Sequence, residues 1–222
     1  MTFQDYMMTF QEKLIQLKQN IEGKMPSEYI QTMHKATADL KASNIEEKVI
    51  KVGDTIPNFD LPNQNKELIS VQDLYKNEFL VITFYRGVWC PYCNADLANL
   101  NKYLPQIEEL GGKMIAISPE KPEYLQKIIK TQNLNFDILH DQSNQFANKL
   151  GLRFNMPDSL IELYRDKFKI NLEEHHGDTD WTLPMPARFL IDKNGVVRYA
   201  ESNPDYTKRP NPDELLDVLK TV

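Results

Sequence analysis

The chain has 222 residues, 41% of them hydrophobic and 26% charged, with a formal net charge of −6 at pH 7. This balance supports a sizeable core and argues against bulk disorder. The acidic charge and scattered lysines argue against a nucleic-acid-binding surface, which would need a basic patch. No apolar run approaches the roughly 20 residues of a membrane span, and residues 1–10 lack the features of a secretory signal. We therefore expect a cytoplasmic protein that binds neither nucleic acid nor membranes.

Residues 1–45 are predicted to form an N-terminal helical hairpin. Apolar positions in the first segment alternate spacings of four and three, which is a helical seam that ends before Gly23: Phe3, Met7, Phe10, Leu14, Leu17 and Ile21. A second helix opens at Pro26-Ser27 and carries on one face Tyr29, Met33, Ala36 and Leu40. The hairpin could pack as an extension of the domain that follows. Alternatively it could make the protein a homodimer, because two amphipathic seams exceed what one hairpin needs for itself.

From residue 50 onward, short strands alternate with helices. Strands are predicted over 68–70, 79–85, 113–118, 136–139, 187–191 and 196–200, and helices over 71–75, 91–110, 122–131, 143–150, 160–168 and 212–219. The run 79–85 is apolar on both parities, which predicts a central strand covered on both faces. Asp192-Lys193-Asn194-Gly195 predicts a hairpin turn. The alternation indicates an α/β domain with a mixed, partly parallel sheet.

The two cysteines of the chain, Cys90 and Cys93, stand between the central strand and the next helix. Pro91 suits the first turn of that helix. Cys90 is then at or near the N-cap, where free backbone N–H groups and the helix dipole favour a thiolate. Cys93 falls one turn further, on the apolar face that includes Leu97. This spacing predicts that Cys90 is the more exposed thiol and Cys93 the more sheltered one.

A close cysteine pair in this position predicts redox catalysis. A thiolate can attack a disulfide or a peroxide oxygen, and the sulfenic acid formed from peroxide can condense with the second cysteine. The alternatives are two inert thiols or half of a metal site. No second cysteine pair is present, and the adjacent His175 and His176 would rarely bind one ion together. We therefore expect neither a metal nor another cofactor.

Further along the chain, the sequence resembles the thioredoxin fold, and more closely the alkyl hydroperoxide reductase / thiol-specific antioxidant family of peroxiredoxins. The order of elements and two prolines, Pro105 within a helix and Pro186 before a strand, are similar to that fold. Residues 53–61 are similar to the family's usual start, 84–93 to its active-site loop and 189–195 to its late hairpin. The likeness covers roughly residues 50–222. It implies a thioredoxin-like α/β domain with a central mixed sheet flanked by helices, following the extension 1–45.

The resemblance also assigns positions within the active-site loop. The family's peroxidatic cysteine falls on Cys93, its supporting threonine on Cys90 and its shielding proline on Arg86. The family's late arginine falls on Pro186, where thioredoxins have a proline. The resemblance implies a cis bond at Pro186 beside the cysteines, and the alternative is a trans proline at the entry of a strand. Thioredoxins also have a tryptophan at the position of Trp89. The chain thus resembles a divergent, peroxiredoxin-like branch with thioredoxin-style residues at several positions of the peroxidase machinery.

Several residues near the pair have two interpretations. Arg86 would lower a thiol pKa if its guanidinium lay within about 6 Å, or it could be an ordinary surface arginine. Trp89 is either part of the site or a surface aromatic that covers the loop. Arg209, with its neighbours Asp205 and Tyr206, could approach the site, but we interpret these residues as the start of the last helix. The polar stretch Glu173-Glu174-His175-His176 is interpreted as a solvated loop.

The function that the resemblance implies is a thiol-dependent antioxidant oxidoreductase. A hydroperoxide would be reduced by a cysteine thiolate, a Cys90–Cys93 disulfide would form, and thioredoxin, glutathione or another thiol reductant would reset it. One alternative is a dithiol–disulfide oxidoreductase acting on protein disulfides, and another is a non-catalytic redox sensor that uses the hairpin to engage a partner. The attacking thiol stays open, because exposure favours Cys90 and the family alignment favours Cys93.

Overall fold

A five-stranded mixed sheet forms the centre of the protein, in the order β5-β4-β3-β8-β9. The computed structural model describes residues 8–222, so Phe3 and Met7 lie outside it. The five strands are β3 (Phe79–Phe84), β4 (Gly112–Ser118), β5 (Asp137–His140), β8 (Ala187–Ile191) and β9 (Val197–Ser202). Strands β3, β4 and β5 run parallel, whereas β8 and β9 are antiparallel to their neighbours. The predicted mixed sheet with a central strand at 79–85 is therefore confirmed.

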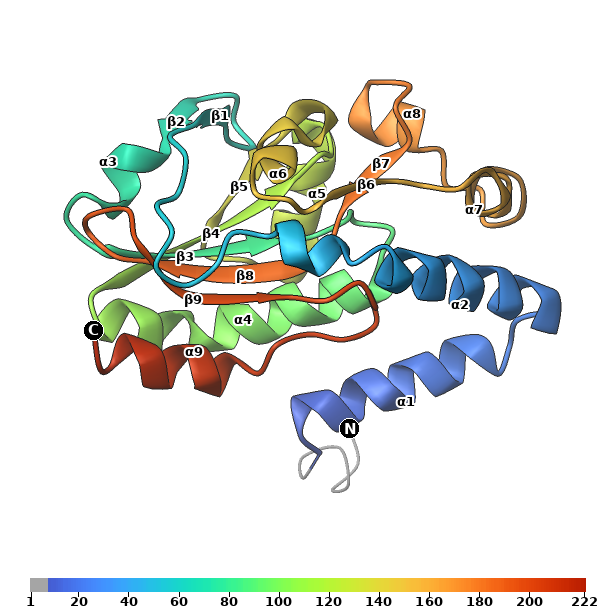
Figure 1. The fold of residues 1–222 in the computed structure, drawn as a ribbon, viewed down its shortest axis with the longest axis horizontal. Helices are drawn as coiled ribbons and strands as arrows, with labels where there is room; N and C mark the ends of the chain where they lie inside the picture. The colour runs from blue at the N-terminus through green and yellow to red at the C-terminus, as the bar shows by residue number, and fades with distance from the viewer. Residues whose placement is uncertain (1–7) are drawn as a thin grey trace.

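Helices and two small sheets surround this sheet (Figure 1). The helices are α1 (Phe10–Glu22), α2 (Ser27–Ala42), α3 (Val71–Tyr75), α4 (Pro91–Glu109), α5 (Pro122–Gln132), α6 (Gln145–Lys149), α7 (Asp158–Glu162), α8 (Leu172–His176) and α9 (Pro212–Leu219). Short 3-10 turns are η2 (Ile45–Lys48) and η3 (Gln142–Asn144), and a π-helical turn, η4 (Leu163–Lys167), extends α7. The small sheets pair β1 (Asp60–Pro62) with β2 (Leu68–Ser70) and β6 (Arg153–Asn155) with β7 (Thr182–Pro184). None of these described helices is long and apolar enough to cross a membrane.

The central strand β3 divides the core into two layers. Because successive side chains of a strand point to opposite faces, Val81 and Tyr85 join one cluster with residues of α1, α4, α5 and α9. Leu80, Ile82 and Phe84 join the other with residues of η2, α3 and α6. Figure 1 shows α4 and α9 on one side of the sheet and α3 and α6 on the other. Burial on both sides explains why this strand is apolar at every position but one, Thr83.

The helix α4 places the cysteines at the edge of this core. Cys90 is its N-cap and Pro91 its first residue. Its buried face carries Tyr92, Cys93, Asp96, Leu97, Leu100, Leu104 and Ile107. Pro105 lies inside the helix as predicted. The predicted apolar face is present, but it also buries a carboxylate at Asp96.

The two N-terminal helices pack within the chain. α1 contacts α4, while α2 contacts α7. Leu14 is buried in the same cluster as the α4 face, and Phe10, Leu17 and Ile21 pack against that cluster. The described part of the seam thus covers the domain, as the packing interpretation expects. The division into 1–45 and 50–222 and the homodimer both stay predictions.

Two local predictions on the sheet's periphery are wrong. The helix predicted from residue 143 begins at Gln145, because Ser143 and Asn144 have positive φ angles of 53° and 54°. The peptide bond before Pro186 is trans, since residues 8–222 contain no cis bond. The Met185 N–H donates to the Leu152 carbonyl and the Pro186 carbonyl accepts from Asn203. These two bonds hold the segment extended as it enters β8.

The contact of Gly151 with the end of η2 gives a stability prediction. Gly151 has a φ of 77°, and an added Cβ would overlap the Lys48 carbonyl group. We expect Gly151→Ala to lower the free energy of unfolding by about 2–4 kcal/mol, from backbone strain plus overpacking. Gly53→Ala is the matched control, because Gly53 has a φ of 95° but open space at its Cβ. Urea unfolding of both variants measures the difference, and equal losses would contradict the packing contribution.

Candidate active site

The two cysteine sulfurs lie together at the N-terminus of α4. Both are free thiols, with 2.6 Å between their Sγ atoms, and the Cys93 N–H donates to Cys90 Sγ at 3.4 Å. Cys90 is 1% exposed and Cys93 0%. Both thiols are thus buried and differ little in exposure, because the N-terminal helices and the aromatic residues around Arg86 cover the loop. Cys90 still lines a pocket, whereas Cys93 does not.

A buried guanidinium that the sequence interpretation set aside contacts Cys93. Arg209 Nη2 donates to Cys93 Sγ at 3.1 Å. The interpretation of Arg209 as part of the last helix start is wrong, because α9 begins at Pro212 and is capped by Asn211. Arg209 Nη1 instead donates to two carbonyls of its own loop, those of Tyr206 and Lys208. The loop between β9 and α9 thus folds back and delivers a cation to the thiol.

Asp96 connects this cation to a second buried arginine. Arg188 Nη2 donates to both Asp96 carboxylate oxygens, at 2.8 and 3.0 Å, and Arg209 Nε lies 3.4 Å from Asp96. All three side chains are buried. Two arginines facing one carboxylate leave a net positive charge next to the Cys93 sulfur. A thiolate at Cys93 would balance that charge.

Arg86 occupies a second buried position beside the pair. It is 2% exposed, so the interpretation as a surface arginine is wrong. Its Nη2 donates to the Tyr164 hydroxyl at 2.6 Å. Its Cζ lies 4.2 Å from the ring centroid of Tyr206, 4.9 Å from that of Trp89 and 5.8 Å from that of Tyr164. These aromatic faces accommodate a buried cation by cation–π attraction.

These charges give the two thiols different pKa values. Burial raises the pKa of Cys90. Burial also acts to raise the pKa of Cys93, but the hydrogen bond with Cys90 and the Arg209 and Arg86 guanidiniums outweigh it and lower this pKa to about 6. The backbone N–H at the helix start favours a charge on Cys90, yet a full cation 3.1 Å from Cys93 is the stronger influence. The geometry therefore favours Cys93 as the thiolate at neutral pH.

A buried carboxylate fixes the loop before the cysteines. Glu120 Oε2 accepts from the Val88 N–H at 2.8 Å, and Glu120 Oε1 lies 2.8 Å from His175 Nδ1. An added Cβ on Gly87 would come within 2.8 Å of Glu120 Oε1 and would also overlap the Trp89 ring. The solvated loop predicted at 173–176 is wrong, because this stretch is α8 and its His176 is 1% exposed. Glu120, which contacts His175, thus fixes the backbone of the active-site loop at Val88.

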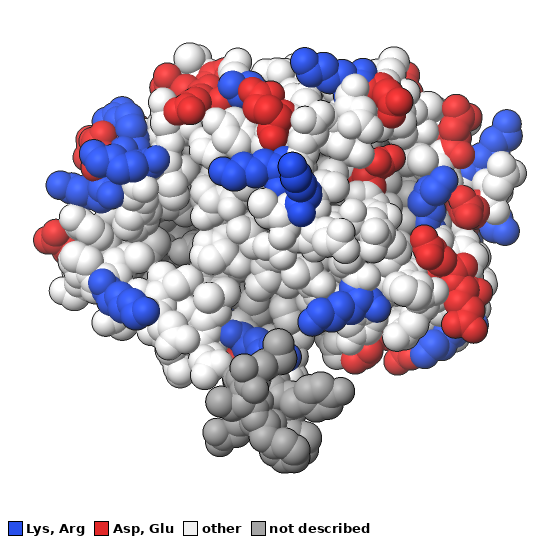
Figure 2. All heavy atoms as spheres, turned by 180° about the vertical axis from the view of Figure 1, so that it is seen from behind, with Lys and Arg blue, Asp and Glu red and all other residues white. Residues whose placement is uncertain are grey.

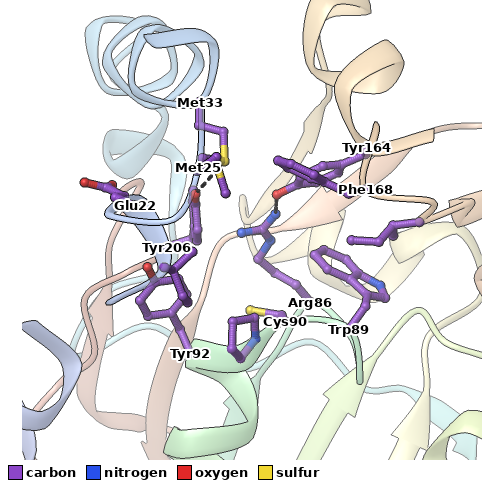
Figure 3. Close-up of a pocket in the computed structure, with 13 residues that line it drawn as sticks. Glu22, Met25, Met33, Arg86, Trp89, Cys90, Tyr92, Tyr164, Phe168 and Tyr206 are labelled. Atoms are coloured by element: carbon purple, nitrogen blue, oxygen red, sulfur yellow. Dashed lines mark hydrogen bonds between the residues drawn. The ribbon is translucent and has the colours of Figure 1, made fainter. Parts of the chain in front are cut away.

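A pocket lies above Cys90, with a volume of about 160 Å³ (Figure 3). Its walls come from the N-terminal helices, the active-site loop, the α7–η4 region and the loop after β9; its lining residues include Glu22, Met25, Met33, Arg86, Trp89, Tyr164 and Tyr206. The structure thus brings Cys90, Cys93, Arg86 and Trp89 together. Pro186 is not among the residues that line this pocket. No group of three or more His, Cys, Asp or Glu side chains within residues 8–222 could hold a metal ion.

Removing the Arg209 charge tests its effect on Cys93. We expect Arg209→Gln to raise the pKa of Cys93 toward the ordinary value of about 8.5, because it removes one of the charges that lower this pKa. The ultraviolet absorbance of the thiolate, followed against pH in proteins that also carry Cys90→Ser, isolates this titration. Lys208→Gln is the control, because it removes a neighbouring exposed charge. An unchanged midpoint in Arg209→Gln would contradict the assigned role.

Comparisons with known proteins show the family and the fold of the chain. Residues 52–200 match the AhpC/TSA family. The chain is 28% identical over 171 residues to the peroxiredoxin Bcp of Escherichia coli (strain K12). This alignment covers 77% of this chain and 96% of that protein. It is 22% identical over 178 residues to the thiol-disulfide oxidoreductase ResA of Bacillus thuringiensis, covering 80% and 82%. Among solved structures, the peroxidoxin BcpB of Mycobacterium tuberculosis matches with a TM-score of 0.61 and 18% identity, covering 78% of this chain and 98% of that one. The predicted thioredoxin-like fold is confirmed.

Proposed function

This chain belongs to the AhpC/TSA family, and on that ground we propose that it is a thiol-dependent peroxidase that reduces hydroperoxides through a Cys90–Cys93 dithiol–disulfide cycle. The observation that carries the proposal is the position of Cys93 Sγ, 3.1 Å from buried Arg209 and 2.6 Å from Cys90 Sγ. The first contact stabilises an attacking thiolate. The second provides a thiol that can resolve the oxidised product.

In the proposed first step, the Cys93 thiolate attacks the terminal oxygen of the hydroperoxide. The O–O bond breaks, the leaving oxygen takes a proton as water or an alcohol, and Cys93 becomes a sulfenic acid. Arg209 and Arg86 hold the negative charge on the sulfur before attack. In the second step Cys90 condenses with the sulfenic acid, water leaves and the disulfide forms. An external thiol reductant then returns both cysteines to the reduced state.

Rapid-mixing measurements test this proposal. Reduced protein is mixed with hydrogen peroxide and with cumene hydroperoxide, and oxidation is followed together with the mass of the product. We expect oxidation much faster than that of free cysteine, and a product two hydrogens lighter than the reduced protein. Oxidation no faster than free cysteine would remove the peroxidase proposal.

A dithiol–disulfide oxidoreductase is the second candidate, because the similarity to a protein named as such spans most of the chain. It requires insulin reduction that depends on Cys90, together with peroxide reactivity at the background level. A redox sensor would instead be oxidised stoichiometrically and would show no turnover when a reductant is supplied. The burial of Cys90 beneath the N-terminal helices is the observation least favourable to a protein disulfide as substrate.

The setting of the reaction is also part of the proposal. A cysteine pair that is reset by thiols requires a reducing compartment, which supports a cytoplasmic location. Positive and negative side chains are interspersed over the face in Figure 2, which offers no single-sign stripe for nucleic acid there.

The side chain of Ile15 in α1 is 58% exposed. This apolar surface supports a homodimer formed through the N-terminal helices. Sedimentation of the full chain at several concentrations tests for that dimer, and a constant monomer mass would remove it.

A further inference from the structure

The pocket above Cys90 contains a cation with unused donors. Arg86 is buried, and its Nε and Nη1 have no hydrogen-bond partner within residues 8–222. Buried donors without acceptors are costly, so a native protein rarely leaves them unmatched. A carboxylate is the group that best satisfies a guanidinium, because its two oxygens match two N–H groups. Arg86 therefore points to a ligand with a carboxylate.

The other walls of the pocket define the rest of that ligand. Glu22 also lines the pocket. Its Oε1 lies 2.7 Å from His34 Nε2 and 3.9 Å from Lys18 Nζ, which leaves Oε2 to attract an ammonium group. Most of the remaining lining is apolar or aromatic, as Figure 3 shows around Met25, Met33 and Trp89. A small zwitterionic molecule with an uncharged middle fits these walls.

The sulfur at the pocket is the one that a reductant has to attack. Cys90 lines the pocket, and Cys93 does not. A thiol that attacks Cys90 of the disulfide expels Cys93, whose low pKa and Arg209 contact make it the better leaving group. Cys90 is only 1% exposed, so a folded protein dithiol is held away from it by the covering helices. The pocket thus suits a small thiol.

We propose that this pocket binds a low-molecular-weight thiol that carries both a carboxylate and an amino group, such as an amino-acid or short-peptide thiol, and that this thiol is the reductant of the Cys90–Cys93 disulfide. The carboxylate binds Arg86, and the amino group lies toward Glu22. This inference rests on the proposed function, which supplies the disulfide in each turnover. It selects the small thiol over thioredoxin as the reductant.

The reduction takes two thiol molecules. The first loses its proton to solvent and attacks Cys90 Sγ; the Cys90–Cys93 bond breaks, and its electron pair leaves on Cys93 as a thiolate. A mixed disulfide then joins the small thiol to Cys90. The second thiol attacks the small-molecule sulfur of that mixed disulfide, and its proton passes to Cys90. The products are the reduced protein and the disulfide of the small thiol.

The test measures rate constants for reduction of the disulfide by glutathione, 2-mercaptoethanol, cysteamine and thioredoxin, each corrected for its thiolate concentration. The disulfide is prepared with diamide, so the test does not depend on any reaction with peroxide. We expect glutathione to be at least about tenfold faster than 2-mercaptoethanol, as charge-assisted hydrogen bonds at one site allow. Cysteamine, which lacks the carboxylate, should not share this advantage.

Two variants locate the recognition. Arg86→Met should remove the advantage of glutathione over 2-mercaptoethanol, whereas Arg165→Met, which removes an exposed arginine of η4, should keep it. The ratio is informative because any effect of Arg86 on Cys93 applies equally to both thiols. Glu22→Gln serves if Arg86→Met does not fold, and it should reduce the preference for glutathione over the purely anionic mercaptoacetate.

The following results would overturn the proposal: no advantage of glutathione in the parent protein, an advantage that survives Arg86→Met, or reduction by thioredoxin faster than by glutathione. If Arg86→Met does not fold, an unchanged preference in Glu22→Gln would also overturn it. Failure of the peroxidase proposal gives a different result, namely slow oxidation by peroxide with reduction of the diamide-made disulfide unaffected.

Discussion

Replacement of Cys93 by serine is expected to abolish the fast reaction with hydroperoxides, whereas Cys90→Ser is expected to retain it. Cys93 has the thiolate-stabilising contact with Arg209 at 3.1 Å, and burial raises the pKa of Cys90. In Cys90→Ser the oxidation should stop at a sulfenic acid, because no second thiol is present to condense with it. Multiple turnover should be lost in both variants. The reaction of Cys93→Ser with peroxide should slow to the rate of an ordinary buried thiol.

Trapping the sulfenic acid distinguishes these outcomes. A dimedone adduct, one per chain, is expected in Cys90→Ser after brief exposure to peroxide, and none in Cys93→Ser. The parent protein provides the control, since its disulfide should form before dimedone reacts. Fast oxidation in Cys93→Ser with none in Cys90→Ser would reverse the assignment and make Cys90 the attacking thiol.

The second large effect is on stability, at Asp96. This buried carboxylate binds Arg188 at 2.8 and 3.0 Å and lies 3.4 Å from Arg209. Asp96→Ala leaves two buried cations without their anion, and removal of one partner of a buried ion pair costs about 3–5 kcal/mol. That is a large share of the 5–15 kcal/mol that stabilises an ordinary domain. We therefore expect Asp96→Ala to be partly unfolded or close to it at 37 °C.

Urea unfolding of Asp96→Ala and of a matched surface variant measures this effect. Asp217→Ala removes an exposed ion pair with Lys220, whose atoms are 3.0 Å apart. Such a pair contributes about 0–1 kcal/mol. The difference between the two variants isolates the cost of burial, and a loss in Asp96→Ala no larger than that in Asp217→Ala would contradict the buried network.

Much of the fold follows from local patterns in the sequence. The run of mostly apolar residues that forms β3 predicts a central strand, and Pro91 predicts the helix start, because both signals act over a few residues. The turn at Asp192–Gly195 and the last helix are likewise where their local signals place them. The helix predicted from residue 143 begins two residues later, because apolar spacing does not encode the two successive left-handed residues Ser143 and Asn144.

The charged part of the site depends on contacts that sequence spacing does not contain. Arg209 lies 116 residues from Cys93 along the chain, so only the path of the loop after β9 reveals their contact. A usable signal was nevertheless present. Asp96 stands on the apolar face of α4 and Arg188 within an apolar strand, and charges in such places usually have buried partners. Pairing these two would have directed attention to a cationic network beneath the cysteines.

The covering of the site could not be predicted from the hairpin pattern alone. The apolar seam of α1 indicated that the helix packs, but not that its last residue, Glu22, and the following Met25 would form a wall over Cys90. Likewise the polar sequence of Glu173–His176 did not indicate that His175 lies against the buried Glu120. Both contacts are tertiary, so the spacing of residues along the chain does not contain them.

The measurement that tests the central claim most directly is the pH dependence of the rate constant for oxidation of reduced protein by hydrogen peroxide. A thiol with a pKa of about 6 is protonated below that pH, so the rate constant should fall tenfold per unit below pH 6. Above pH 7 it should be constant and well above that of free cysteine. A rate constant that continues to rise to a midpoint near the ordinary cysteine value of about 8.5, or that never exceeds free cysteine, would contradict activation of Cys93 by the buried arginines.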